Sequence, residues 1–103
     1  MVKQQPQVNE FDVFRHSNRV AYRQVGGEVL LVPVRTDPKQ PSGVYTLNRT
    51  ASFLWLQIDG NKDVRGLAAA METQFEVSIE QAMLDTTQLI SDLLSFMAVE
   101  TVS

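Results

Sequence analysis

The chain has 103 residues, of which 44% are hydrophobic and 20% are charged, proportions that fit one globular domain with a single modest core. It contains no cysteine and one histidine, which excludes disulfides, thiolate chemistry and any metal site built from several histidines. No stretch approaches the roughly 20 apolar residues that span a bilayer and no signal peptide is apparent, so we expect a cytoplasmic protein without membrane contact.

The first half of the chain reads as an arm followed by a hairpin. Residues 1–17 are polar and show no usable hydrophobic period, so they are predicted to form a flexible arm before a single domain at 18–103, although Val8, Phe11, Val13 and Phe14 could dock part of it. Two β-rich runs, Val20–Val25 and Glu28–Val34, are separated by two glycines, which tolerate the positive φ of a tight hairpin turn. Pro33 has no amide to donate, so pairing on one side of the second strand should stop near that residue.

A third strand is predicted at Val44–Leu47. The preceding segment, Thr36–Gly43, contains two prolines and a glycine and is a loop by composition. A connection this short favours an antiparallel return of the third strand beside the second.

Three helices follow. Asn48, Asp63 and Ser78 each precede an amphipathic segment and can accept a hydrogen bond from an amide of the first turn. The apolar residues of each helix share one face; in the first helix they are Ala51, Leu54, Trp55 and Ile58. Val99–Val102 reads as a short strand or a frayed end. The predicted fold is α+β and winged-helix-like, with a three-stranded antiparallel meander followed by three helices.

Charge is distributed unevenly and bears on the function. All nine Lys and Arg residues lie at or before Arg65, whereas residues 66–103 carry six acids and no base. Winged-helix domains often bind DNA, but the helix that would enter the major groove here, Ser78–Met97, carries Glu80, Asp85 and Asp92. A DNA-binding regulator therefore remains only an alternative, as does a structural, self-associating domain.

One ordered set of motifs resembles the PqqD-like family. The strand-to-helix junction reads Tyr45-Thr46-Leu47-Asn48, then Thr50-Ala51, Trp55 and Asp59-Gly60. The hairpin around Gly26-Gly27, the helix that begins at Val64-Arg65-Gly66-Leu67 and the long last helix are similar in placement, so the resemblance covers roughly residues 18–100.

The resemblance implies a non-enzymatic peptide chaperone, or precursor-peptide recognition element. The leader of a ribosomally made precursor would add as a strand to Val44, Tyr45, Thr46 and Leu47, against the last helix. The partner would be a modifying enzyme, of the radical S-adenosylmethionine type in the namesake pathway of pyrroloquinoline quinone biosynthesis. No catalytic residue, metal, cofactor or nucleic acid is expected.

Residues of the last helix extend this prediction. Asp85, Gln88 and Asp92 are predicted to border the peptide groove, where an acidic rim would favour leaders that carry Lys or Arg. Leu84 projects away from the core stripe and is assigned, together with Phe96, to a second surface for a partner or a dimer. The open third strand also predicts a weak homodimer, because an unpaired edge pairs with its own copy as readily as with a peptide.

Overall fold

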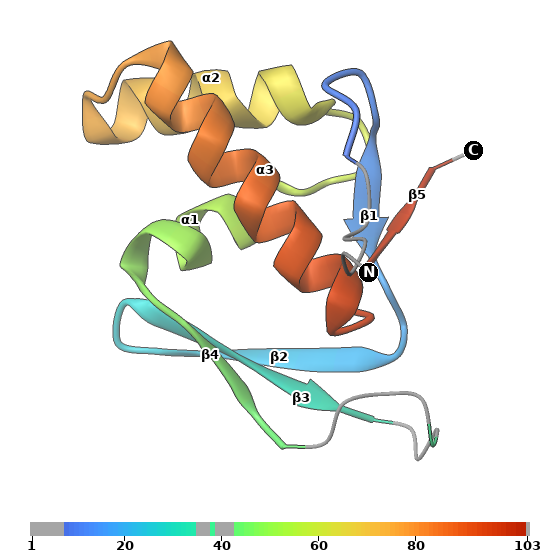
Figure 1. The fold of residues 1–103 in the computed structure, drawn as a ribbon. Coiled ribbons are helices and arrows are strands. Elements are labelled where there is room, and N and C mark those ends of the chain that lie inside the picture. Colours follow the sequence, from blue (N-terminus) through green and yellow to red (C-terminus); the bar gives the residue numbers. More distant parts are fainter. Residues whose placement is uncertain (1–7, 35–37, 39–42, 103) are drawn as a thin grey trace, which may run out of the picture.

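The computed structural model describes residues 8–34, 38 and 43–102, which form two small antiparallel sheets and three helices (Figure 1). The elements are β1 (Phe14–His16), β2 (Val20–Val25), β3 (Glu28–Pro33), β4 (Tyr45–Leu47), α1 (Arg49–Gln57), α2 (Val64–Phe75), α3 (Ile79–Ser95) and β5 (Val99–Thr101). The predicted α+β fold with a three-stranded meander and three helices is confirmed.

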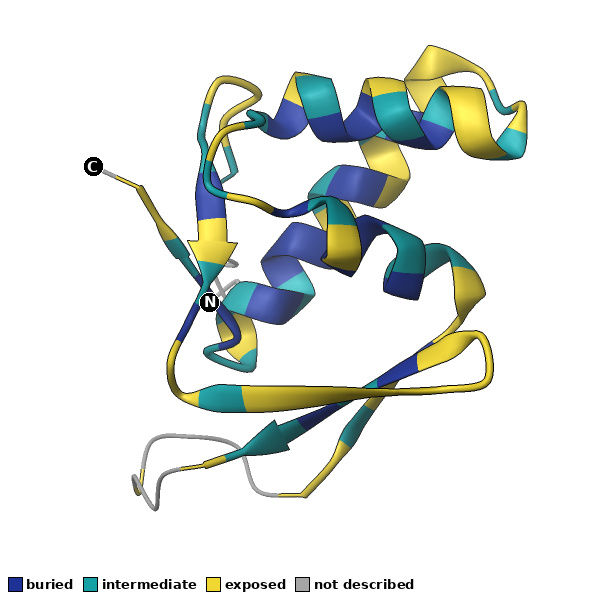
Figure 2. Cartoon of the chain, turned by 180° about the vertical axis from the view of Figure 1, so that it is seen from behind, coloured by how far each residue is buried: buried dark blue, intermediate teal, exposed yellow. Residues whose placement is uncertain are grey.

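The larger sheet has the strand order β2-β3-β4, and the three helices lie on one side of it, with α1 against the sheet and α2 farther away (Figure 1). None of the described helices lies on the other face, and much of that face is exposed or half-buried (Figure 2). Gly26 adopts φ +64° between β2 and β3, which confirms the predicted hairpin turn. Of the predicted loop at Thr36–Gly43, only Pro38 and Gly43 lie among the described residues.

Pro33 limits the pairing of β3 on one side only. Toward β2 the pairing continues to the end of the strand, where the Val34 amide donates to the Arg19 carbonyl at 3.0 Å. Toward β4 the register stops at Leu31 opposite Tyr45. Because successive residues of a strand direct their amides to alternate neighbours, the missing Pro33 amide falls on the β4 side. The predicted one-sided loss of pairing is confirmed.

All three predicted helix caps are formed. Side-chain oxygens of Asn48 and Asp63 accept hydrogen bonds from the amides of Ala51 and Gly66, both at 2.8 Å, and Ser78 accepts from Gln81 at 3.1 Å. The apolar stripes of the helices meet the inner face of the sheet in one core. Its largest fully buried side chains include Trp55, Leu31, Leu47, Leu54, Leu67, Met71, Ile90 and Leu93.

The prediction that residues 1–17 form a flexible arm is wrong for its last part. Phe14–His16 is strand β1, which pairs with β5, and the side chain of Phe14 is 2% exposed in the core. The opposite edge of this strand is also occupied, because the amide of Gly60 donates to the Phe14 carbonyl and that of Val64 to the Asp12 carbonyl, both at 3.1 Å. Residues 1–7 lie outside the described residues.

β1 also places the single histidine against the core. The His16 ring stacks on Trp55 with 3.6 Å between ring centroids and 3° between planes, and its Nε2 lies 2.8 Å from the Trp55 carbonyl oxygen. Burial lowers the pKa of His16 from its ordinary value, although the hydrogen bond to Trp55 opposes that shift. The ring therefore links β1 to α1 through stacking and a hydrogen bond.

Candidate binding groove

One edge of β4 is open among the residues that the structure describes. β4 is the last strand of its sheet, and its other edge pairs with β3 through Val29 opposite Leu47. At that position the Ser52 hydroxyl stands between the two strands: it accepts from the Val29 amide at 2.8 Å and donates to the Leu47 carbonyl at 3.1 Å. The backbone groups of Leu47 therefore face β3.

The alternation of a strand then fixes the direction of the neighbouring peptide groups. Because Leu47 directs its backbone groups toward β3, the amide and carbonyl of Thr46 point to the open edge. The Leu47 side chain is 1% exposed and lies in the core, and Tyr45, two residues earlier, shares that inner face. β4 thus offers hydrogen-bonding groups along its edge and an aromatic ring beside it.

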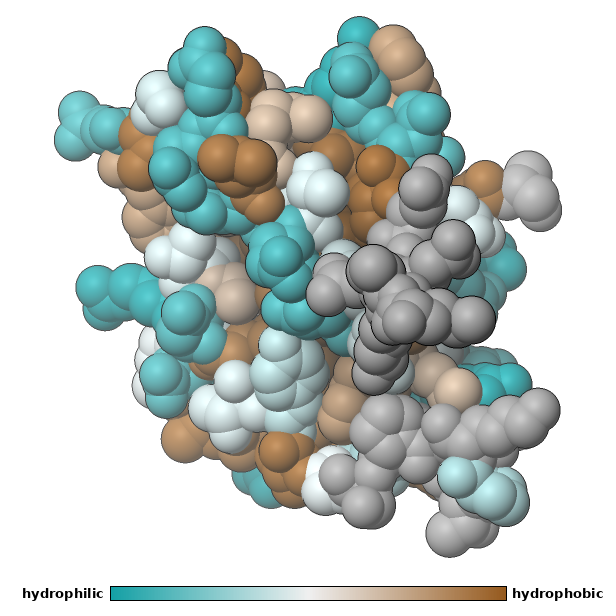
Figure 3. Space-filling view, in the orientation of Figure 1, coloured by the Kyte–Doolittle hydropathy of each residue, from teal (hydrophilic) through white to brown (hydrophobic). Residues whose placement is uncertain are grey.

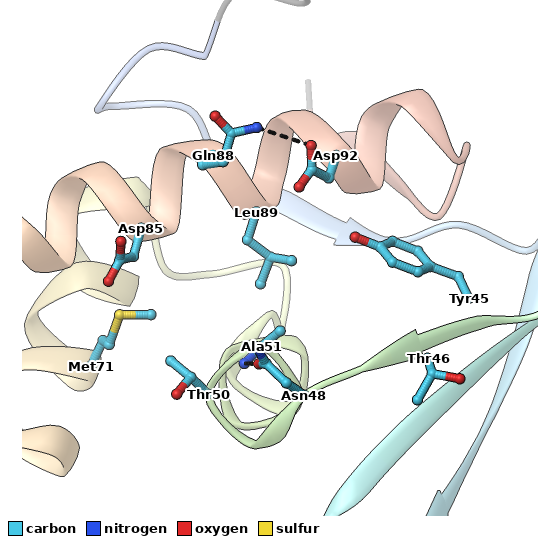
Figure 4. A pocket seen from close by; sticks show the side chains of 10 residues that line it. All are labelled: Tyr45, Thr46, Asn48, Thr50, Ala51, Met71, Asp85, Gln88, Leu89 and Asp92. Atoms are coloured by element: carbon cyan, nitrogen blue, oxygen red, sulfur yellow. Dashed lines mark hydrogen bonds between the residues drawn. The ribbon is translucent and has the colours of Figure 1, made fainter.

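A hollow of about 470 Å³ lies between β4, the start of α1 and the side of α3 (Figure 4). Its floor is apolar, with Leu89, Met71 and Ala51, and its rim is polar. Asp85, Gln88 and Asp92 stand along α3 on that rim, as helical spacing of three and four residues requires (Figure 4). The remaining lining residues are Tyr45, Thr46, Asn48 and Thr50.

A second hollow of about 350 Å³ continues the first toward the beginning of β4. It is lined by Val44, Tyr45, Asp92, Ser95 and Phe96, so the two hollows share Tyr45 and Asp92. The rings of Tyr45 and Phe96 are in contact, with 5.2 Å between their centroids. We call the two hollows together the β4–α3 groove.

The rim of the groove is negative. The side-chain amides of Gln81 and Gln88 donate to Asp85 at 2.8 Å and to Asp92 at 3.0 Å, which orients both carboxylates without neutralising them. Within residues 8–34, 38 and 43–102 no cation forms a salt bridge with either one. Burial and the charge of Asp92 both raise the pKa of the Tyr45 phenol, so this side chain stays neutral.

The structure gathers most of the predicted peptide-binding residues into this groove. Tyr45, Thr46, Asp85, Gln88 and Asp92 line the first hollow, and Val44 lines the second. Leu47 is the exception, because its side chain is buried and its backbone faces β3.

The predicted second surface is divided. Phe96 belongs to the β4–α3 groove, whereas Leu84, which is 67% exposed, borders a separate apolar hollow of about 510 Å³ with Ile79, Met83 and Thr87. These two residues do not form one patch. In the space-filling view the face that carries α3 is mainly hydrophilic or neutral, with hydrophobic patches set apart from one another (Figure 3).

Sequence reasoning missed the floor of the groove and the role of Ser52. Met71 and Leu89 lie on helical apolar stripes, a pattern that predicts only burial in the core, and both are indeed largely buried. Their additional exposure to the hollow depends on how far β4 stands from α3, which spacing along the chain does not define. A serine on the buried face of α1 was the available signal for the bridge between β3 and β4.

Comparison with known proteins identifies the family. The family model of coenzyme PQQ synthesis protein D (PqqD) matches residues 28–95. The chain belongs to the PqqD family. The matched segment runs from β3 to the end of α3 and so contains both walls of the groove, whereas β1 and β5 lie outside it.

Two solved structures share the fold of this PqqD-family chain. One is TbiB1 in complex with the TbiA(beta) leader peptide, with 17% identity and a TM-score of 0.73, covering 86% of this chain and 98% of that one. The other is lasso peptide synthetase B1 complexed with the leader peptide, with 18% identity and a TM-score of 0.71, covering 84% and 96%. No curated protein matches the chain. Of the helices that the structure describes, none is long and apolar enough to cross a membrane.

Proposed function

We propose that this chain is a non-enzymatic recognition protein that binds the leader of a ribosomally made precursor peptide and presents it to a modifying enzyme. The leader adds as a fourth strand beside β4. The observation that carries the proposal is the open edge of β4 next to the β4–α3 groove, with the Thr46 amide and carbonyl directed outward. Main-chain hydrogen bonds supply affinity in such strand addition, and pockets for alternate side chains supply selectivity.

Family and fold support the same reading. PqqD-family membership covers both walls of the groove, and the two similar structures are complexes of their own proteins with leader peptides. The residues of the groove provide an edge, an apolar floor and a polar rim, which together suit an extended peptide.

Two common means of catalysis, a free histidine and a bound metal ion, have no support in the described part of the chain. His16 stacks on Trp55, and no group of three or more His, Asp or Glu residues there is placed to hold a metal ion. The chemistry therefore belongs to a partner enzyme. A radical S-adenosylmethionine enzyme, acting toward pyrroloquinoline quinone or a related peptide-derived product, is the partner we propose from the family.

An NMR titration tests the proposal. The probe is a synthetic copy of the N-terminal part of a short peptide encoded beside this gene, added to the ¹⁵N-labelled full chain. We expect the largest shifts at Val44–Leu47 and along Asp85–Asp92, and slower amide exchange at Thr46 because its amide acquires an acceptor. Shifts confined to residues around Leu84, or none in β4 at saturating peptide, would overturn strand addition.

A further inference from the structure

The β4–α3 groove consists of two hollows with different chemistry on either side of Tyr45. The first, at the end of β4 that leads into α1, carries the carboxylates of Asp85 and Asp92 on its rim. The second, at the beginning of β4, is lined by the apolar groups of Val44 and Phe96, by Ser95, and by Asp92, which borders both hollows, so that only the first has two carboxylates. The Tyr45 ring lines both hollows and contacts Phe96, so it stands between them.

None of the described residues gives the first hollow a positive partner. Its two carboxylates accept hydrogen bonds from Gln81 and Gln88, and no Lys or Arg of the described residues forms a salt bridge with them. The apolar floor below them, Leu89 and Met71, suits the methylene stem of a long basic side chain whose charged end reaches the rim. A Lys or Arg side chain therefore matches both the floor and the rim.

The second hollow favours an apolar side chain. The exposed Val44 side chain, 58% accessible, and the paired rings of Tyr45 and Phe96 leave apolar surface uncovered. Covering such surface with a ligand side chain is favourable in proportion to the apolar area removed from water. Leu, Ile, Val or an aromatic residue would serve.

Strand geometry links the two hollows to a pattern in the ligand. A peptide that pairs with β4 turns alternate side chains toward the inner face, where Tyr45 and Leu47 already point. Only residues separated by an even number of positions can then occupy both hollows. Residues of that inner set stand about 6.6–6.8 Å apart for each two positions.

We propose that the groove selects leaders with one basic and one apolar anchor residue placed two or four positions apart. The basic anchor enters the hollow of Asp85 and Asp92, and the apolar anchor packs against Phe96 and Val44. This assignment rests on the proposed strand addition beside β4 and adds the class of leader sequence that the strand must carry.

Synthetic peptides of about ten residues, the length of a long strand, test the pattern. Each carries one Lys and one Leu on a Ser/Thr background, in either order, two, three or four positions apart, and binding to the full chain is measured by NMR and calorimetry. We expect the better order with even spacing to bind about tenfold more tightly than the same order with a spacing of three. Equal affinity at all spacings, with Thr46 still perturbed, would overturn the anchor rule alone.

A charge variant tests the basic anchor separately. In Asp85→Asn/Asp92→Asn the ratio of the affinities for the Lys and norleucine peptides, measured on the same variant, should fall to about one. The control, Glu76→Gln/Glu80→Gln, removes the same charge outside the groove and should keep the preference. A preference that survives the first variant would overturn the assignment of the first hollow. If no peptide, nor the natural leader, perturbs Thr46, the proposed function itself fails.

Discussion

Strands β1 and β4 are each three residues long, yet their edges are used differently. β1 is enclosed: β5 pairs with one edge, and at the other edge Gly60, between α1 and α2, bonds to Phe14, while Val64 at the start of α2 bonds to Asp12 just before the strand. β4 pairs with β3 alone and leaves its second edge beside a hollow. The comparison indicates that a short strand becomes a binding template when its free edge lies next to side-chain pockets, whatever its length.

A proline in β1 should have the largest effect, and on stability. The Val102 amide donates to the Val13 carbonyl and the Ser17 amide to the Ala98 carbonyl, both at 2.8 Å, so by alternation the Arg15 amide between them also faces β5. Arg15→Pro removes that ladder bond and should cost about 2–4 kcal/mol in the free energy of unfolding. Denaturant unfolding measures it. Arg15→Ala, which removes only the exposed salt bridge with Glu100, should cost less than about 1 kcal/mol.

The same substitution in β4 should spare the fold and abolish binding. Thr46→Pro removes an amide that points to the open edge, so the midpoint of thermal unfolding should change little. The affinity for the leader should fall at least tenfold, which is a loss of about 1.4 kcal/mol in binding free energy. Thr46→Val keeps the amide and should bind normally. Unimpaired binding by the proline variant would remove β4 from consideration as the template.

The hydrogen bonds of the Ser52 hydroxyl should contribute to stability, because they join β4 to β3. Ser52→Ala leaves the Val29 amide and the Leu47 carbonyl without the hydroxyl that joins them, in a buried place, and should destabilise the fold by about 1–3 kcal/mol. Chemical unfolding gives this value. Thr50→Ala, on the same helix but at the groove, is the control and should leave stability within about 0.5 kcal/mol.

Acid should lower the stability of the fold through His16 in the enclosed strand β1. Burial lowers the pKa of His16 below its ordinary 6.5, so the unfolded chain binds this proton more readily than the folded chain. The His16 contribution to stability is complete above pH 6.5 and is lost as the pH falls through the lowered pKa. Unfolding measured between pH 8 and 5.5 should show the decline, and His16→Gln should flatten it. A decline of equal slope in His16→Gln would assign it to other groups.

Self-association should be the weakest effect. We predict that the β4 edge pairs with a second copy at concentrations of several hundred micromolar, which corresponds to a free energy of association of about −5 kcal/mol. Excess leader should then release monomers in sedimentation experiments, because peptide and second copy compete for Thr46. Leu84→Ser should leave the mass distribution unchanged, since Leu84 borders a separate hollow. Loss of the dimer in Leu84→Ser would instead place the contact on that hollow.

Local chemistry in the sequence determined the hairpin, the third strand, the three caps and the order of elements from Val20 to Ser95. The signals are a Gly-Gly link, an Asn, Asp or Ser before a period of apolar residues, and a proline at a strand end. Each acts within a few residues, so it can be recognised without knowledge of distant contacts. Helical spacing also showed that Asp85, Gln88 and Asp92 share a side, and the ordered motifs indicated the family before any comparison.

Only the tertiary structure decided which element each face of a helix or strand packs against. The pairing of β1 with β5 joins residues about eighty-five positions apart, for example Phe14 with Thr101, and nothing local to either segment specifies it. The same pairing places His16, which the sequence predicts to lie in a flexible arm, against the ring of Trp55. Packing likewise set β4 beside α3 and the Phe96 ring against Tyr45. The faces of an element follow from its period, whereas the partner of each face follows from how the whole core closes.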